Sequence, residues 1–209
     1  MQLLKITALV IAALMILLLP RQADAQLLDY GFKAGVNISS VTNSVYRTGS
    51  MTGSHFGMFA AYNFRILPIS IQTEMLYSQL GTEYDEIVIG FQAPRPASLR
   101  MNYIQLPLLV KAHLPIPGPV TPNIFGGPYV GFRSGISFNF GGMDVPQAEE
   151  WYRDGDFGFV VGVGTRVGFF VVDLDLEVRL LFGMENIFDR QFEYDEQHRA
   201  ISFSAGIVF

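Results

Sequence analysis

Apolar side chains alternate strictly with small or polar ones along much of this chain. In residues 30–38 every even-numbered position is apolar or aromatic, and every odd-numbered position is glycine, lysine or asparagine. A period of two is the repeat of a β-strand whose two faces meet different surroundings, whereas a helix repeats every 3.6 residues. The pattern therefore predicts an all-β fold.

The alternation recurs in eight segments, each long enough to cross a bilayer as a strand of about 9–11 residues. They cover residues 30–39, 56–66, 69–78, 104–114, 129–138, 157–167, 172–182 and 198–209. Long connections near 40–54, 81–99, 141–155 and 184–196 alternate with short ones near 67–68, 115–121 and 168–169. Pro107, inside the fourth segment, indicates a bulge or a local break in pairing. We predict an eight-stranded up-and-down antiparallel transmembrane β-barrel, because such barrels alternate long outer loops with short periplasmic turns.

The first 25 residues have the pattern of a secretory signal peptide. Lys5 precedes an uncharged apolar run over residues 6–19, and Ala23-Asp24-Ala25 offers an Ala-x-Ala cleavage site. The run is shorter than the ~20 residues that a spanning helix needs. We expect a cleaved signal peptide at 1–25 and an outer-membrane β-barrel domain at 26–209. An even number of strands then places both termini of the mature chain in the periplasm.

Alternation alone leaves open which face lies inside, so a soluble lipocalin-like barrel with an apolar lumen is an alternative. The glycines between 127 and 164 favour the membrane barrel, because an eight-stranded barrel has a narrow interior. Basic residues share the glycine face and would cost ~2–4 kcal/mol each if turned to lipid at the bilayer midplane. The apolar face carries aromatic residues near the turns (Phe32, Phe64, Phe169 and Phe209) and near the loops (Phe56, Tyr77, Phe138, Phe157 and Phe182).

Ten charged side chains fall on the predicted lumen face. They are Lys33, Arg65, Glu74, Lys111, Arg133, Arg166, Asp173, Asp175, Glu177 and Arg179. In a narrow, poorly hydrated lumen an unpaired charge is expensive, so these residues are expected to pair with one another. We predict a structural network of ion pairs that fills the barrel, in preference to an open pore or a catalytic or metal site at residues 173–177.

Composition excludes several classes of function. The chain has no Cys, which removes disulfides and thiolate sites, and its three His leave little for a metal cluster. A net charge of −5 disfavours nucleic acid as a partner. The polar residues expected at the loop rim are scattered along the chain: His55, Asp154, Asp156, Glu185, Asp189, Asp195 and His198. We therefore expect no enzymatic activity, cofactor or metal. Tyr46, Tyr84, Trp151 and Tyr152 are expected to pack in the loops, with a partner surface as the alternative.

Four short stretches share their order with one family. They are GFKAGVN at 31–37, YIQLPLLVK at 103–111, GPYVG at 127–131, and Arg179 followed by GMENI at 183–187. With these stretches the whole mature chain resembles the PorT-like outer-membrane β-barrel proteins of Bacteroidota. Phe209 resembles the C-terminal aromatic that presents such proteins to the outer-membrane assembly machinery. The resemblance implies fold and location, whereas activity differs among members, some of which serve protein secretion or gliding.

We expect an integral outer-membrane protein with a structural or interaction role through its extracellular loops. Its expected partners are outer-membrane lipid, lipopolysaccharide and the assembly machinery. An accessory role in a protein secretion system, with other envelope or secretion proteins as partners, is the alternative. A membrane enzyme at the loop rim and a soluble lipocalin-like binder are further alternatives.

Overall fold

The computed structural model describes residues 27–42, 44, 47–87, 94–145, 152–169, 172–187 and 196–209. The predicted signal peptide, residues 1–25, lies outside them. In this part of the chain no helix is long and apolar enough to cross a membrane.

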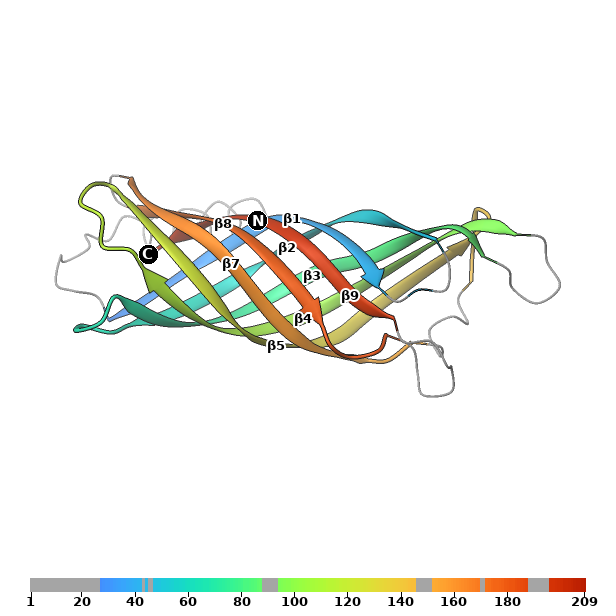
Figure 1. Ribbon diagram of the computed structural model, residues 1–209, viewed down its shortest axis with the longest axis horizontal. Coiled ribbons are helices and arrows are strands. Elements are labelled where there is room, and N and C mark those ends of the chain that lie inside the picture. Colours follow the sequence, from blue (N-terminus) through green and yellow to red (C-terminus); the bar gives the residue numbers. More distant parts are fainter. Residues whose placement is uncertain are drawn as a thin grey trace, which may run out of the picture.

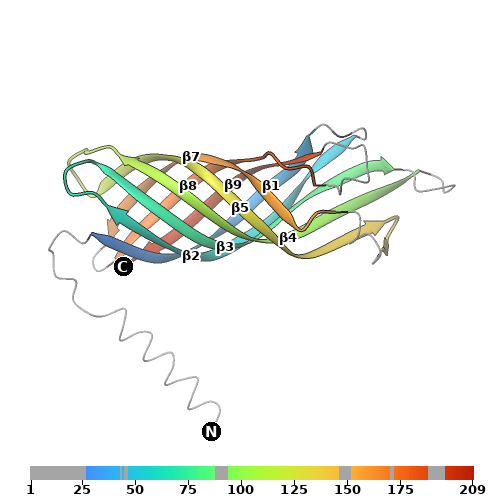
Figure 2. The same ribbon diagram turned by 90° about the horizontal axis from the view of Figure 1, so that it is seen from below.

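The described residues form a closed antiparallel barrel (Figures 1 and 2). The strands are β1 (Leu28–Thr42), β2 (Thr48–Asn63), β3 (Ile69–Ile87), β4 (Arg95–His113), β5 (Val120–Phe140), β6 (Met143–Asp144), β7 (Gly155–Phe169), β8 (Val172–Gly183) and β9 (Gln197–Val208). Each long strand pairs with its neighbours in the chain, and β9 pairs with β1 to close the ring. The short β6 pairs only with the end of β5. The predicted eight-stranded up-and-down barrel is confirmed.

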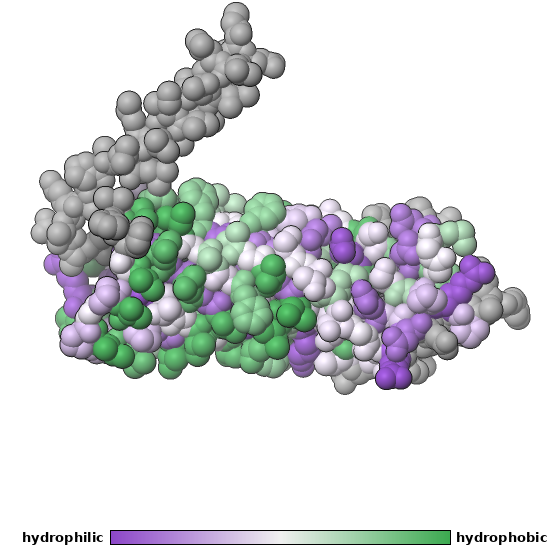
Figure 3. Space-filling view, turned by 90° about the horizontal axis from the view of Figure 1, so that it is seen from above, coloured by the Kyte–Doolittle hydropathy of each residue, from purple (hydrophilic) through white to green (hydrophobic). Residues whose placement is uncertain are grey.

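Apolar side chains point out of the barrel and polar ones point in. Along β1, Phe32 and Val36 are 60% and 46% exposed, whereas Lys33 and Asn37 are 4% and 2% exposed. The same outward rows cover residues 56–62 of β2, 69–77 of β3, 104–112 of β4, 120–132 of β5, 157–167 of β7, 172–182 of β8 and 201–207 of β9. We call them, with residues 28–38, the apolar belt (green in Figure 3). A lipocalin-like barrel would bury these rows, so that alternative is wrong.

Several strands continue beyond the apolar belt into segments that were predicted to be loops. Most of residues 40–54 and 81–99 belongs to β1–β4. On β1–β4 beyond the belt most exposed side chains are polar, as at Arg100, whereas Leu80 and Leu99 point inward and are buried. The strands were predicted from an apolar face that points outward. The predicted strands therefore ended where the apolar side chains begin to point inward. The predicted loop boundaries were therefore wrong, and the barrel continues beyond the apolar belt as β-structure.

One irregularity changes the face of a strand. The β4–β5 register shifts between Asn102 and Tyr103, which leaves Ser134 as an extra residue in β5. A bulge sends every later side chain to the opposite face. Phe138 is therefore 5% exposed inside the barrel, and its prediction as an outward aromatic was wrong. At Pro107 the predicted local break in pairing is confirmed, because residues 74–75 and 106–107 are not paired between β3 and β4. The register does not shift, since residues 73 and 108 and residues 76 and 105 pair in the same frame.

Glycines leave room for aromatic rings in the lumen. A Cβ atom on Gly162 would lie 2.4 Å from Cζ of Phe125, and one on Gly31 would lie 2.7 Å from Cζ of Phe59. Both rings are inward-facing and buried. The glycine-rich face is thus filled by rings from neighbouring strands, as expected for the interior of an eight-stranded barrel.

We expect Gly162→Ala to destabilise the barrel by about 1–3 kcal/mol, because overpacking moves the Phe125 ring and the neighbouring backbone. Gly155→Ala is the matched control on the same strand, since no atom lies nearer than 4.0 Å to its added Cβ. Urea unfolding in lipid vesicles measures both. Equal stability of the two variants would contradict this packing.

Candidate functional site

Six charged side chains meet inside the barrel at the level of the apolar belt. We call them the lumen charge cluster: Lys33, Glu74, Lys111, Asp175, Glu177 and Arg179. All are at most 4% exposed. Three cations meet three carboxylates, so the cluster is neutral if every group is ionised. Strand pairing brings the six together from β1, β3, β4 and β8.

Glu177 is the centre of this cluster. Its Oε2 accepts a hydrogen bond from Nζ of Lys33 at 2.8 Å, and its Oε1 accepts one from Nζ of Lys111 at 2.6 Å. Arg179 contacts the same carboxylate and also donates to Oε2 of Glu74 at 2.8 Å. Multiple charge-assisted hydrogen bonds of this kind offset the cost of burying ions.

Aromatic rings complete the surroundings of the three cations. Nζ of Lys33 lies 4.9 Å from the centroid of the Phe59 ring, and Nζ of Lys111 lies 5.3 Å from that of Phe125. The guanidinium of Arg179 lies 5.5 Å from the Phe125 centroid. The rings that the glycines accommodate therefore also contact the charges.

The other predicted lumen charges lie elsewhere. Arg166 donates to Asp29 at 2.6 Å near the turn end of the barrel. Arg133 pairs with Asp154 at the loop end, at 2.5 Å, and Asp173 is half-buried beside the turn end of β8. Arg65 is exposed in the turn between β2 and β3, so its placement in the lumen was wrong. The alternation of β2 was extended through residues 64–66, where the strand has already ended.

A second polar group lies beside the cluster on its outer side. Nδ1 of His55 lies 2.8 Å from Oδ1 of Asn37, and Nε2 of His55 lies 2.8 Å from Oγ of Ser204. Because the Asn37 oxygen can only accept, Nδ1 carries the proton and Nε2 accepts from the serine. Ser202 also donates to Asn37, at 2.7 Å. His55 was expected at the loop rim, but it is 3% exposed in the lumen.

The outer part of the lumen is filled by apolar and aromatic side chains. We call the part of this group that lies beyond the apolar belt the outer plug: Val41, Leu80, Tyr84, Ala97, Leu99, Met101, Tyr103, Phe138, Phe140, Tyr152, Ile187 and Ala200. The same cluster continues to the level of the belt through Leu109, Phe125, Tyr129, Val160 and Leu181. The sequence interpretation missed it. The signal was present at residues 97–103, where Ala97, Leu99, Met101 and Tyr103 alternate in the frame of the inward-facing Gln105.

Polar groups also lie buried within this outer region. Glu196 is 2% exposed and accepts a hydrogen bond from the Tyr84 hydroxyl at 2.8 Å and another from Ser44. Burial raises the pKa of the Glu196 carboxyl. His198 is completely buried, and the Tyr103 hydroxyl lies 3.2 Å from its Nε2.

Several residues that were expected at the exposed loop rim are therefore buried inside the barrel. Asp156, with 5% exposure, accepts a hydrogen bond from Tyr129 at 2.7 Å, and Tyr84 and Tyr152 are buried as loop packing requires. Asp154 and Glu185 pair with Arg133 and Arg153. Tyr46, Trp151, Asp189 and Asp195 lie outside the described residues. Among the described residues no three metal-ligating side chains gather.

We expect Glu177→Gln to destabilise the barrel by about 3–5 kcal/mol, because it leaves an uncompensated positive charge in the buried cluster. Asp154→Asn is the control. It removes one partner of Arg133, which also donates to the Tyr152 carbonyl, and the Asp154 side chain is 89% exposed, so the change should stay below about 1 kcal/mol. Urea unfolding in vesicles measures the free energy of unfolding of both variants. If Glu177→Gln lost as little stability as Asp154→Asn, the lumen charge cluster would have to be hydrated.

His198 should make stability depend on pH. Burial lowers the pKa of this imidazole to about 4, from 6.5 in an unfolded chain. The unfolded state therefore binds the proton first, and the contribution of His198 is lost as pH falls from 6.5 to about 4, by up to ~3 kcal/mol. Glu196, whose pKa is raised, changes stability with pH in the opposite direction. The contribution of His198 is therefore isolated by comparing the wild type with His198→Gln, which retains a polar partner for Tyr103. The difference between the two unfolding curves should shrink on acidification; a constant difference would show that His198 titrates normally.

Comparison with known proteins agrees with this architecture. The sequence matches the model of a family described as outer membrane protein beta-barrel domain, over residues 22–189. Neisserial surface protein A (NspA) is similar in structure, with 16% identity and a TM-score of 0.50, over 86% of this chain and 95% of that one. At this identity the likeness concerns the fold alone.

Two further solved structures were found. Ail, the attachment invasion locus protein of Yersinia pestis, has 14% identity and a TM-score of 0.45, covering 87% of this chain and 98% of that one. The N-terminal β-barrel domain of Pseudomonas aeruginosa OprF has 12% identity and a TM-score of 0.41, covering 88% and 98%. No curated protein matches the sequence. Because the family model spans most of the chain, this protein belongs to the outer membrane protein beta-barrel domain family.

Proposed function

We propose that this barrel is a closed, non-conducting outer-membrane protein that acts through its outer end. The observation that carries the proposal is the filling of the lumen at two levels. The neutral charge cluster occupies the level of the apolar belt, and the outer plug occupies the part beyond it. A pore would need a continuous water-filled path between such side chains.

The outer end offers a surface suited to contacts with other molecules. β3, β4 and β5 are long strands that run on to one end of the barrel (Figure 1). Beyond the apolar belt they carry the exposed Glu83, Asp85 and Arg100 and the partly exposed Asn139. The outer plug supports these strands from within, so the surface is held by a packed core. Rigid presentation of polar groups favours a structural or adhesive role.

We also propose that the Ser204–His55–Asn37 chain is structural and that the protein is not an enzyme. Its connections resemble those of a nucleophile, a base and an orienting residue. However, Ser204 is only 8% exposed, and the cavity beside His55 and Asn37 has a volume of about 10 Å³. That is room for one water molecule at most, which leaves no space for a substrate.

The proposed route to the membrane rests on the two ends of the chain. Residues 1–25 would direct export as a cleaved signal peptide, and Phe209 would present the barrel to the assembly machinery. Phe209 pairs with Tyr30 through its backbone N–H at 2.8 Å, and their ring centroids are 6.0 Å apart. Both ends of the barrel chain would then lie in the periplasm.

The relationship to PorT-like proteins is a proposal that rests on the four sequence stretches. In the structure two of them lie in β4 and β5, where Tyr103, Gln105, Lys111 and Tyr129 point into the lumen. These shared residues therefore concern packing inside the barrel. They do not identify a cargo, so a role in secretion is the second candidate.

We expect the purified barrel to give no stable conductance steps in a planar lipid bilayer, because side chains fill its lumen. Liposomes containing it should not swell in small sugars. The same preparation must show a heat-dependent shift in gel mobility, which proves that the barrel is folded. Reproducible single-channel steps from the folded fraction would overturn the proposal of a closed barrel.

A further inference from the structure

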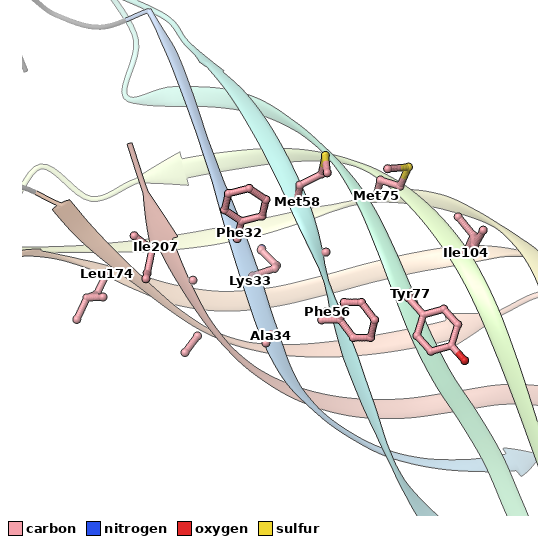
Figure 4. Close-up of a pocket in the computed structure, with 13 residues that line it drawn as sticks. Phe32, Lys33, Ala34, Phe56, Met58, Met75, Tyr77, Ile104, Leu174 and Ile207 are labelled. Atoms are coloured by element: carbon pink, nitrogen blue, oxygen red, sulfur yellow. The ribbon is translucent and has the colours of Figure 1, made fainter. Parts of the chain in front are cut away.

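An apolar groove crosses the lipid-facing surface of the barrel. Its volume is about 840 Å³, within the range of 300–1,000 Å³ that is usual for ligand sites. Two rows of outward-facing side chains from neighbouring strands border it, and Figure 4 shows most of them. One row is Leu174, Ile207, Phe32, Met58 and Met75; the other is Ala205, Ala34, Phe56, Tyr77 and Ile104.

Small residues create this groove. Ala34 pairs directly with Ala205 in neighbouring strands, so the second row has no side chain beyond Cβ at its β9–β1 end. The inward-facing row beneath includes Gly57 and Gly206, which pair with Lys33. Large side chains such as Phe32 and Phe56, each more than half exposed, form the walls.

The groove runs obliquely through one half of the apolar belt. From Leu174 on β8 to Ile104 on β4 it crosses five strand spacings of ~4.8 Å, or roughly 24 Å. Strands tilted by about 35–45° give this path a rise of roughly 14–17 Å, about half of the ~30 Å hydrocarbon core. Its outer end, at Tyr77 and Ile104, lies where the belt gives way to Gln79 and Asn102. The path therefore matches a chain that descends from the outer surface into a single leaflet.

A positive charge lies beyond this outer end. Arg100 is on β4, four residues outward from Ile104, and its side chain is exposed. It forms no ion pair with any residue that the structure describes. An arginine near a membrane surface attracts anionic headgroups.

We propose that the groove binds one acyl chain of an anionic lipid of the outer leaflet, whose headgroup lies near Arg100. The proposal rests on the barrel's spanning the outer membrane. Hydrocarbon is the solvent around the belt, so apolar contact alone provides no driving force for a second protein copy to enter the groove. Without Arg100 any lipid of the leaflet could fill a groove of this volume, whereas the positive charge of Arg100 favours binding of a lipid with an anionic headgroup.

Native mass spectrometry after transfer from vesicles into mild detergent tests this proposal. The vesicles contain equal amounts of dipalmitoyl phosphatidylglycerol and dipalmitoyl phosphatidylcholine. Each variant must first show the heat-dependent gel shift, so that loss of lipid is not confused with failure to fold or insert. We expect the wild type to retain one phosphatidylglycerol, with about a fivefold preference over phosphatidylcholine.

Ala34→Leu fills the groove and should abolish this retention. Ala60→Leu adds the same side chain to another outward-facing position on β2 that does not line the groove, and it should retain the lipid. If Ala34→Leu does not fold, Ala205→Leu replaces it. Arg100→Gln should keep a retained lipid but lose the headgroup preference, whereas Arg95→Gln, at the start of the same strand, should behave as wild type.

Results of three kinds would overturn the proposal: no binding, no effect of a variant that should have one, and a protein partner in place of lipid. The first is the absence of a retained lipid on the folded wild type. The second is equal retention by Ala34→Leu and Ala60→Leu, or an unchanged preference in Arg100→Gln. The third is a dimer mass that Ala34→Leu removes, which would make the groove a contact between two copies.

Discussion

Pairing of buried charge determines which face of each strand lies outside. The cluster around Glu177 needs partners from β1, β3, β4 and β8 at once, so none of these strands can slip by one residue without placing a charge in lipid. Lipid favours the same arrangement from outside, because it accepts the apolar rows and rejects ions. Closure of the sheet, in turn, satisfies the backbone groups that lipid cannot. These three requirements agree on one register.

The same packing separates the barrel into regions with different roles. At the level of the belt, ions and rings fill the narrow lumen that the glycines leave. Beyond the belt the surroundings are reversed, since water lies outside and the apolar outer plug inside. This half therefore resembles a small water-soluble β-barrel built on a membrane-spanning one. The outer plug holds the strands that project beyond the belt, and the surface of the belt contacts lipid.

Much of this fold could be predicted from the sequence, because alternation reports directly on the surroundings of each strand face. The alternation predicted the number of strands and the orientation of their faces. It also predicted ten lumen charges, of which six meet in the lumen charge cluster. Predictions failed where the pattern changes meaning: at Ser134, where one extra residue exchanges the faces before Phe138, and at residues 97–101, where the apolar face turns inward. The Ser204–His55–Asn37 chain joins residues far apart in sequence, so only the strand registers bring them together.

The orientation of alternate side chains is the central claim, and site-directed spin labelling tests it most directly. The natural chain has no Cys, so single cysteines can be placed along β8 from residue 172 to 183 without further changes. In vesicles, labels at Leu174, Leu176, Val178 and Leu180 should be the most accessible to oxygen dissolved in lipid, and labels between them should be protected. The account would be contradicted if accessibility to a water-soluble nickel reagent were highest at the even positions. It would also be contradicted if accessibility did not alternate along the strand.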